Sequence, residues 1–169
     1  MILRELTSFD APVFETFLDS WEDSSGMSLI YGLIGGLDFN SYVKILNESR
    51  DGINLGPQEV PTTSLFAFFD GHIIGKISIR HHLNPLLEKR GGHVGFGVLS
   101  LYRGKGFAKQ MLGLSLAHCR KIGLKKILLT CEETNDPSIK VIIRNGGVLD
   151  QLNDTKLADA KILRFWITL

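Results

Sequence analysis

The sequence of 169 residues predicts a mixed α/β fold of the α+β kind, with about four helices flanking a mostly antiparallel sheet of about seven strands. Three observations carry this prediction. Short apolar runs with strand patterning recur along the chain, an Asp70-Gly71 turn joins two of them into a hairpin, and later runs alternate with amphipathic helices. The strand–helix–strand connection over residues 93–131 predicts a parallel pair near the centre of the fold.

Length and composition predict a single domain over residues 1–169, because a chain of this size buries one core well. The net charge of +1 gives no reason to expect nucleic-acid binding. No apolar run approaches the roughly 18 residues of a membrane span, and early charges at Arg4 and Glu5 argue against a signal peptide. Cys119 and Cys131 lack metal or redox spacing, so we expect a cytoplasmic protein with reduced, buried thiols.

The first sixty residues predict one short strand and two helices. Residues 1–6 are apolar enough to open a sheet, and Asp10 is expected to cap the first helix. A second helix is expected to start near Asp38, where apolar residues recur three and four apart. The connecting residues 24–36 and 51–61 are rich in glycine, serine or proline and predict loops.

The middle of the chain predicts three antiparallel strands. Residues 65–69 form a continuous apolar run, which is typical of a strand covered on both faces. Residues 73–80 alternate, with Ile73, Gly75, Ile77 and Ile79 expected on one face. A short excursion with one helical turn at 86–89 precedes the next strand, which is expected over residues 93–98.

The last third predicts a helix over residues 108–122 and a strand over 125–131. Asn135 or Asp136 is then expected to cap another helix that ends at Asn145-Gly146-Gly147. Two strands, over residues 147–152 and 161–169, are expected to close the chain.

The Arg103-Gly-Lys-Gly turn between a strand and a helix predicts an anion site. The first amides of a helix lack intrahelical partners, the helix dipole is positive there, and glycines let an anion approach the backbone. The spacing excludes a P-loop, because Gly97 lies too far from Gly104. It also excludes a dinucleotide fingerprint, because Lys109 stands where the third glycine would be. A turn that binds no ligand is the remaining alternative.

The pattern Arg-x-x-Gly-x-Ala, from Arg103 to Ala108, resembles the pyrophosphate loop of the GNAT N-acetyltransferases, which is Gln/Arg-x-x-Gly-x-Gly/Ala. The order of the predicted elements is similar to that fold over most of the chain. The resemblance implies acetyl-CoA as co-substrate, and a fourth and a fifth strand that splay apart around its pantetheine arm. The cofactor-binding residues that it implies are Val98, Leu99, Ser100, Arg103, Gly104, Lys105, Gly106, Phe107, Ala108, Asn135 and Ser138.

The activity that the resemblance implies is transfer of an acetyl group from acetyl-CoA to a primary amine of a small molecule or peptide, by direct attack in a ternary complex. Two departures from the family pattern matter: Ser100 replaces a common proline, and Ile142 replaces a tyrosine that serves many members as general acid. Isoleucine cannot donate a proton, which keeps open a non-catalytic acyl-CoA-binding module as the alternative. For Asn135, a plain helix cap is an equally good interpretation. Pairing into a homodimer also stays open.

His93 is the residue that we expect to accept the proton of the acceptor amine. Many family members carry an acidic residue at this place, and an imidazole with an ordinary pKa of about 6.5 suits proton transfer near neutrality. Alternation puts His93 on one face with Gly95 and Gly97, which leave space for a substrate. The alternative is a hydrogen-bonded structural histidine. The rival bases are then His82, Glu132 and Glu133.

A metal site is a weaker hypothesis, prompted by His72, His81, His82 and His93. Adjacent side chains of an extended strand point to opposite faces, so His81 and His82 cannot easily bind one ion together. We therefore predict no metal ligands.

Overall fold

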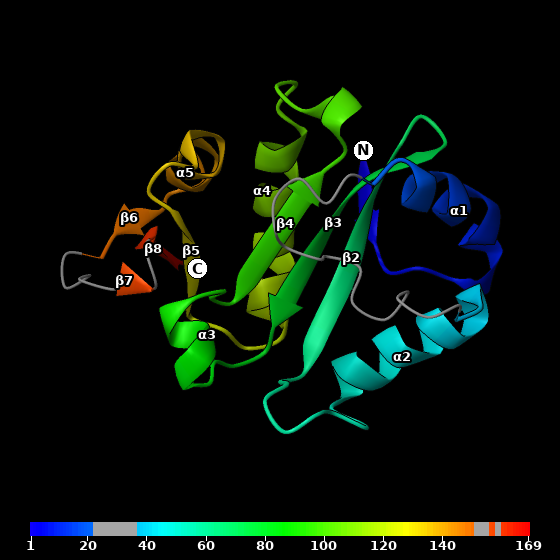
Figure 1. The fold of residues 1–169 in the computed structure, drawn as a ribbon, viewed down its shortest axis with the longest axis horizontal. Helices are drawn as coiled ribbons and strands as arrows, with labels where there is room; N and C mark the ends of the chain where they lie inside the picture. The colour runs from blue at the N-terminus through cyan, green and yellow to red at the C-terminus, as the bar shows by residue number, and fades with distance from the viewer. Residues whose placement is uncertain (22–36, 151–155, 158–159) are drawn as a thin grey trace.

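The computed structural model describes residues 1–21, 37–150, 156–157 and 160–169 (Figure 1). The helices of the described chain are α1 (Ala11–Asp19), α2 (Phe39–Asp51), α3 (Pro85–Lys89), α4 (Phe107–Lys121) and α5 (Asp136–Ile143), with 3-10 turns η1 (Ser8–Asp10) and η2 (Ser100–Tyr102). The strands are β1 (Ile2–Arg4), β2 (Thr62–Phe69), β3 (His72–Arg80), β4 (Val94–Val98), β5 (Lys126–Glu132), β6 (Val148–Leu149), β7 (Lys156–Leu157) and β8 (Ala160–Thr168).

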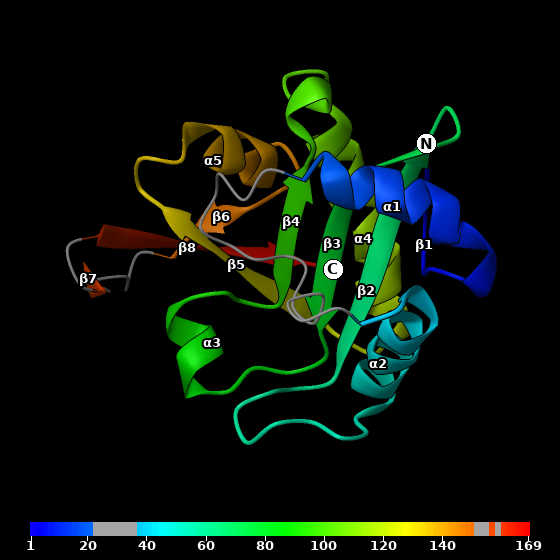
Figure 2. The same ribbon diagram turned by 45° about the vertical axis from the view of Figure 1, so that its right-hand side comes forward.

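The strands form two antiparallel groups that meet at β4 and β5. The first sheet has the order β1-β2-β3-β4, and the second has the order β5-β8-β6, with β7 also paired to β8. In Figures 1 and 2, α4 lies behind the first sheet, whereas α1 and α2 lie on its other face. The mixed, mostly antiparallel fold is therefore confirmed, and the central pair is the boundary between two sheets rather than a continuous ladder.

Apolar side chains cover both faces of the first sheet. Towards α4, the strand residues Ile77 and Val94 pack with Met111 in one buried cluster. Towards α1 and α2, the second cluster is aromatic, with the ring centroids of Phe14 and Tyr42 5.2 Å apart. This double cover explains the continuous apolar run of β2.

The hairpin between β2 and β3 has the predicted turn. Asp70 and Gly71 both have positive φ, 50° and 76°, as a two-residue turn that matches the strand twist requires. The strict alternation predicted for β3 is wrong at one end, because the register shifts between Ala67 and Phe68. Ile73 consequently packs in the aromatic cluster and Ile74 in the cluster under α4.

The N-terminal helices follow the sequence with one correction. Asp38 caps α2 as expected, since its carboxylate accepts a hydrogen bond from the N–H of Ser41 at 3.1 Å. Asp10 does not cap α1 with its side chain. Its carboxylate instead accepts from the N–H of Thr7 and from both terminal nitrogens of Arg4, each at 2.7 Å, and its pKa falls to about 2 through these bonds.

The remaining predicted elements differ from the observed ones in length, or lie outside the described residues. The helical turn expected at 86–89 is α3, and the strand expected over 147–152 is shorter, Val148–Leu149. The loop expected over 24–36 lies outside the described residues. Lys156–Leu157 adds the short strand β7, which the sequence did not indicate.

Candidate functional site

The outer edge of β4 is the first component of the site. Gly95, Gly97 and Leu99 direct their backbone groups towards β3, as the bond from the N–H of Leu99 to β3 indicates. Successive residues of a strand alternate, so the backbone groups of Phe96 and Val98 point away from β3. No strand of the described chain forms a ladder with this edge. It can therefore hydrogen-bond an extended ligand.

The two sheets are joined just before β4 begins. The N–H of His93 donates to the carbonyl of Leu128 at 2.7 Å, and the N–H of Leu128 donates to Nδ1 of His93 at 2.9 Å. The N–H of Gly91 donates to the Thr130 hydroxyl at 2.7 Å. A Cβ at Gly92 would collide with the Leu128 carbonyl, so this close approach requires glycine. Beyond this junction the two strands belong to separate sheets.

His93 is buried at that junction, with 8% of its surface exposed. Burial lowers its pKa to about 4, and the neighbouring charges of Arg80 and His82 act in the same direction. The Nδ1 lone pair already accepts the Leu128 N–H, which puts the proton of the neutral ring on Nε2. This geometry favours the structural interpretation of His93 over the role of proton acceptor.

The turn between η2 and α4 forms an open cradle of backbone amides. Gly104 and Gly106 have φ of 75° and 84°, and an added Cβ at either would meet no atom within 4 Å. Gly106 is the N-cap of α4, and no side chain caps that end. The first amides of α4 are therefore available to an anion, as the sequence predicts.

Side chains around the cradle hold it in place. Nε of Arg103 donates to the carbonyl of Val98 at 3.0 Å, which ties the turn to the end of β4. The Phe107 ring packs against Tyr102, with centroids 5.9 Å apart, beneath the turn. Lys105 is exposed, with Nζ 5.6 Å from the Tyr102 centroid. Arg103 and Lys105 thus place two positive charges beside the open amides.

The other predicted cofactor residues lie on both sides of the β4 edge. Leu99 is buried in the aromatic cluster, Ser100 is exposed at the start of η2, and Ala108 is half-buried in α4. At the start of α5, Oδ1 of Asn135 accepts from the N–H of Ser138 at 3.1 Å. Asn135 is therefore a helix cap in this structure, and its contact with the pantetheine arm stays a prediction.

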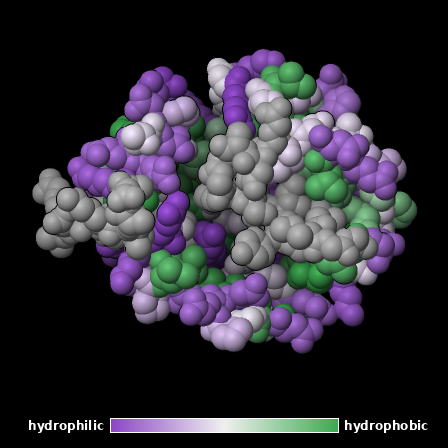
Figure 3. Space-filling view, in the orientation of Figure 1, coloured by the Kyte–Doolittle hydropathy of each residue, from purple (hydrophilic) through white to green (hydrophobic). Residues whose placement is uncertain are grey.

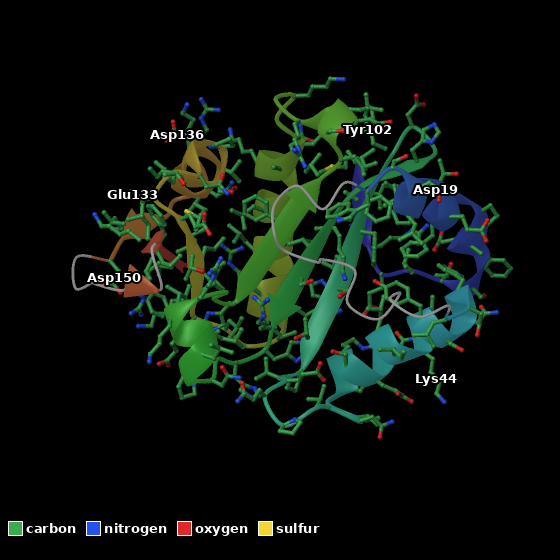
Figure 4. All side chains as sticks on the ribbon, in the orientation of Figure 1. Asp19, Lys44, Tyr102, Glu133, Asp136 and Asp150 are labelled. Atoms are coloured by element: carbon green, nitrogen blue, oxygen red, sulfur yellow. The ribbon has the colours of Figure 1, made fainter. Side chains whose placement is uncertain are left out.

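A cavity of about 660 Å³ opens beside the cradle along α4. Figure 4 shows Tyr102 at the end of β4 and Asp136 at the start of α5, on opposite sides of the β4 edge. The cavity reaches from Gly106 in the amide cradle to Asn145, which follows α5. Its lining residues are Met1, Gly106, Lys109, Gln110, Gly113, Leu114 and Asn145.

Of the rival bases named from the sequence, His82 acts electrostatically on His93, whereas Glu132 and Glu133 form ion pairs elsewhere. His82 is exposed in the segment before α3. Glu132, at the end of β5, pairs with Arg90 at 3.0 Å, and Glu133 pairs with Lys161 at 2.8 Å. Both carboxylates lie at the surface, where an ion pair leaves them open to water.

Two side chains, Ile142 on α5 and Cys131 on β5, bear on the chemistry. Ile142 is buried, with 1% of its surface exposed, so no proton donor stands at the place of the family's tyrosine. Cys131, on β5, is half-buried beside the cluster under α4. Burial and the nearby Glu132 raise the pKa of the Cys131 thiol to about 11, so the thiol is protonated near neutrality.

A polar row on β3 was missed by the sequence interpretation. Lys76, Ser78 and Arg80 occupy alternate positions and so share one face of the strand, opposite Gly97 and Gly95 of β4 and His93 just before it. The signal was present as alternating polar residues, but only the register shows that they lie beside the β4 glycines.

Several solved structures share this fold at low sequence identity. A ribosomal-protein-alanine N-acetyltransferase from Brucella melitensis is 19% identical, with a TM-score of 0.64 over 100% of both chains. A RimL ribosomal L7/L12 alpha-N-protein acetyltransferase in complex with coenzyme A is 15% identical, with a TM-score of 0.66 over 99% of this chain and 93% of that one. RimJ from Mycobacterium smegmatis, in complex with a CoA-disulfide, is 22% identical, with a TM-score of 0.61 over 98% and 80%. No curated protein sequence matches the chain.

An open strand edge beside a cradle of backbone amides suits an extended ligand that carries phosphates. The family model of the acetyltransferase (GNAT) family matches residues 39–146, and the chain belongs to that family. It is therefore an acetyltransferase with acetyl-CoA as its co-substrate.

Two features are absent from the described residues. No group of three or more histidine, cysteine, aspartate or glutamate side chains lies close enough together there to hold a metal ion. None of the helices in those residues is both long enough and apolar enough to cross a membrane.

Proposed function

We propose that this enzyme transfers the acetyl group of acetyl-CoA to the primary amine of a small molecule or peptide, by direct attack in a ternary complex. The observation that carries the proposal is the continuity between the amide cradle at Gly104 and Gly106 and the β4 edge at Phe96 and Val98, with which no strand of the described chain pairs. A ligand with two phosphates and an extended amide-containing arm matches the two parts together.

The proposed binding mode assigns a part of the cofactor to each part of the site. The amides at the start of α4 hold the pyrophosphate, and Arg103 and Lys105 add charge attraction. The pantetheine amides pair with the backbone of Phe96 and Val98. The adenosine end occupies the cavity along α4, beside Lys109.

The chemical step needs a neutral amine held at the thioester carbonyl. The amine nitrogen attacks the carbonyl carbon, backbone N–H groups of the β4 edge stabilise the oxyanion, and the C–S bond then breaks to release CoA thiolate. Because His93 engages its lone pair at the junction, we assign removal of the ammonium proton to water, with Glu132 at the end of β5 as the candidate carboxylate. Solvent protonates the thiolate, since Ile142 offers no proton.

Calorimetric titration with acetyl-CoA, followed by thiol release across a panel of amines, tests this function. We expect binding in the micromolar range, typical of KM values of enzymes, and amine-dependent thiol release. Binding without release for any amine would favour the non-catalytic acyl-CoA-binding module. Absence of binding would overturn both.

A further inference from the structure

The turn that follows α5 brings one side chain, Asn145, onto the first turn of α4. Its carboxamide nitrogen Nδ2 donates to the carbonyl of Val141 in α5 at 2.8 Å and to the carbonyl of Lys109 in α4 at 3.3 Å. A carboxamide NH₂ group has two N–H donors, so these two bonds use both of them. The Asn145 side chain therefore joins the end of α5 to the first turn of α4.

The backbone after α5 fixes the position of Asn145. The N–H groups of Asn145 and Gly147 both donate to the carbonyl of Ile142, at 3.1 and 3.0 Å. Gly146 has φ of 88°, and a Cβ at Gly147 would collide with the Ile142 side chain, so both positions favour glycine. Because Ile142 is buried in the cluster under α4, the turn that carries Asn145 is anchored to α4.

Gly113, one turn further along α4, accommodates the Asn145 carboxamide. A Cβ at Gly113 would lie 3.1 Å from Oδ1 of Asn145, which is closer than ordinary van der Waals contact. Glycine in the interior of a helix lowers the stability of that helix relative to alanine. The close contact with Asn145 gives a physical reason for glycine at this position.

The bond to Lys109 bears on the amide cradle because Lys109 follows the N-cap Gly106 by only three residues. The cradle itself is open, since a Cβ added at Gly104 or Gly106 would meet no atom within 4 Å. Its position therefore depends on the first turn of α4. Arg103 holds the cradle from the end of β4, and Asn145 holds the first turn of α4 from the α5 side.

Asn145 also lines the cavity along α4, together with Gly106, Lys109 and Gly113. The proposed binding mode gives this cavity to the adenosine end of the cofactor. Figure 3 shows hydrophilic residues gathered over α5 on the outer surface, whereas its inner side packs in the cluster under α4. One side chain thus holds the first turn of α4 and forms part of the cavity wall.

We propose that Asn145 is a positioning residue for acetyl-CoA, which holds the first turn of α4, and with it the amide cradle, in the arrangement that binds the cofactor. This inference rests on the proposed function and adds a residue that sets cofactor affinity. Amides that are ordered before binding lose less conformational entropy when the ligand arrives. Without the bond to Lys109, the ligand would have to order the turn, and affinity would fall.

Asn145→Ala tests this role, because alanine cannot donate to either carbonyl. In calorimetric titrations we expect the affinities for acetyl-CoA and for adenosine 3′,5′-bisphosphate to fall by the same factor, about fivefold or more. With an acetylated amine, the KM for acetyl-CoA should rise while kcat stays within about twofold. A purely structural loss would lower the urea midpoint without this division between KM and kcat.

Asn84→Ala is the matched control. Asn84 caps α3, and its Nδ2 donates to the Gln58 carbonyl at 2.9 Å, so it also joins two segments of the chain. In Figure 1, α3 lies at the opposite end of β4 from the cradle. The control should lower the urea midpoint and leave the affinity for acetyl-CoA unchanged.

Gly113→Ala is a second variant, in which stability and affinity should separate. Alanine favours the helix over glycine, so the urea midpoint should not fall. The new Cβ displaces the Asn145 carboxamide, so acetyl-CoA affinity should fall about threefold or more. Because both changes act on one contact, the double variant Gly113→Ala/Asn145→Ala should bind within about twofold of Asn145→Ala alone.

The outcomes separate this inference from the function on which it rests. Wild-type affinity in Asn145→Ala, or an equal loss in Asn84→Ala, would overturn the positioning role while leaving the acetyltransferase intact. Additive losses in the double variant would overturn the coupling between Gly113 and Asn145. If Asn145→Ala does not fold, unchanged affinity in Gly113→Ala overturns the inference. Failure of the wild-type protein to bind acetyl-CoA would overturn the proposed function itself.

Discussion

The Leu128 N–H donates to Nδ1 of His93, and the His93 N–H donates to the Leu128 carbonyl. The side chain and the backbone of His93 thus satisfy the backbone N–H and the carbonyl of Leu128, at the point where the two sheets meet. Ladder pairing between β4 and β5 does not continue beyond this junction, and that is what leaves the β4 edge open. We therefore propose that His93 positions the β4 edge that would bind the cofactor.

Replacing His93 tests this role. His93→Ala leaves the buried Leu128 N–H without an acceptor, which should cost about 1–3 kcal/mol of unfolding free energy. His93→Asn keeps an oxygen acceptor near the Nδ1 position and should retain most of the stability and most of kcat. Urea unfolding and amine-dependent thiol release measure the two effects. A stable His93→Asn protein whose kcat falls 100-fold would instead restore His93 as the proton acceptor.

The pH dependence of stability gives an independent test of the same residue. The pKa of His93 is about 4 in the folded protein and about 6.5 when unfolded, so the unfolded chain binds more protons between these values. The free energy of unfolding should therefore fall as the pH drops from 6.5 to 4, by up to about 3 kcal/mol for this group. His93→Asn should flatten that part of the curve. An unchanged slope in this variant would show that other titratable groups cause the pH dependence of the free energy of unfolding.

Gly106→Glu tests the amide cradle. The new side chain would occupy the open space above the turn and bring a negative charge against the phosphates, so we expect acetyl-CoA affinity to fall at least 100-fold, or about 3 kcal/mol. Gly106 has φ of 84°, so the substitution also strains the backbone. Gly123→Glu is the matched control, because Gly123 follows α4 with φ of 88° and equally open space. Calorimetry should show lost binding only for Gly106→Glu; equal affinities in both variants would contradict the cradle.

The features that could be predicted from the sequence are those set by interactions between residues close together in the chain. The Asp70-Gly71 turn, the Asp38 cap and the glycines before α4 depend on neighbours within a few residues, and all three stand as expected. The anion cradle was predictable for the same reason, because Gly104 and Gly106 set its backbone without distant contacts.

Distant contacts explain what the sequence could not predict. The acceptor capacity of His93 is taken by Leu128, which lies 35 positions further along the chain. The register shift between Ala67 and Phe68 places Ile73 and Ile74 in different clusters, and no local pattern marks it. The position of Ser78 opposite Gly95 depends on the strand register, which only the paired strands define.

Lys105 and Arg103 should contribute to acetyl-CoA affinity in different ways. Lys105 is exposed, so Lys105→Ala should weaken binding by about 1 kcal/mol or less, and this loss should shrink as salt is raised. Arg103→Ala should weaken it more, because it also removes the bond to the Val98 carbonyl at the end of β4. Titrations at low and high salt measure both, with exposed Lys44→Ala as the control. A salt-independent affinity would argue against charged contacts to the phosphates.

Direct attack by the amine, without an acetyl-cysteine intermediate, is the last prediction. Burial raises the pKa of both Cys119 and Cys131 to about 11, so near pH 7 a fraction of only about 10⁻⁴ of either thiol is the nucleophilic thiolate. Cys131 lies on β5 next to the proposed arm, whereas Cys119 is fully buried in α4, so only Cys131 has access to the thioester. Cys131→Ser should therefore keep kcat within a few-fold, and initial rates should give intersecting lines for a ternary complex. Parallel lines together with an acetylated Cys131 in the wild-type protein would establish a ping-pong route and refute direct attack.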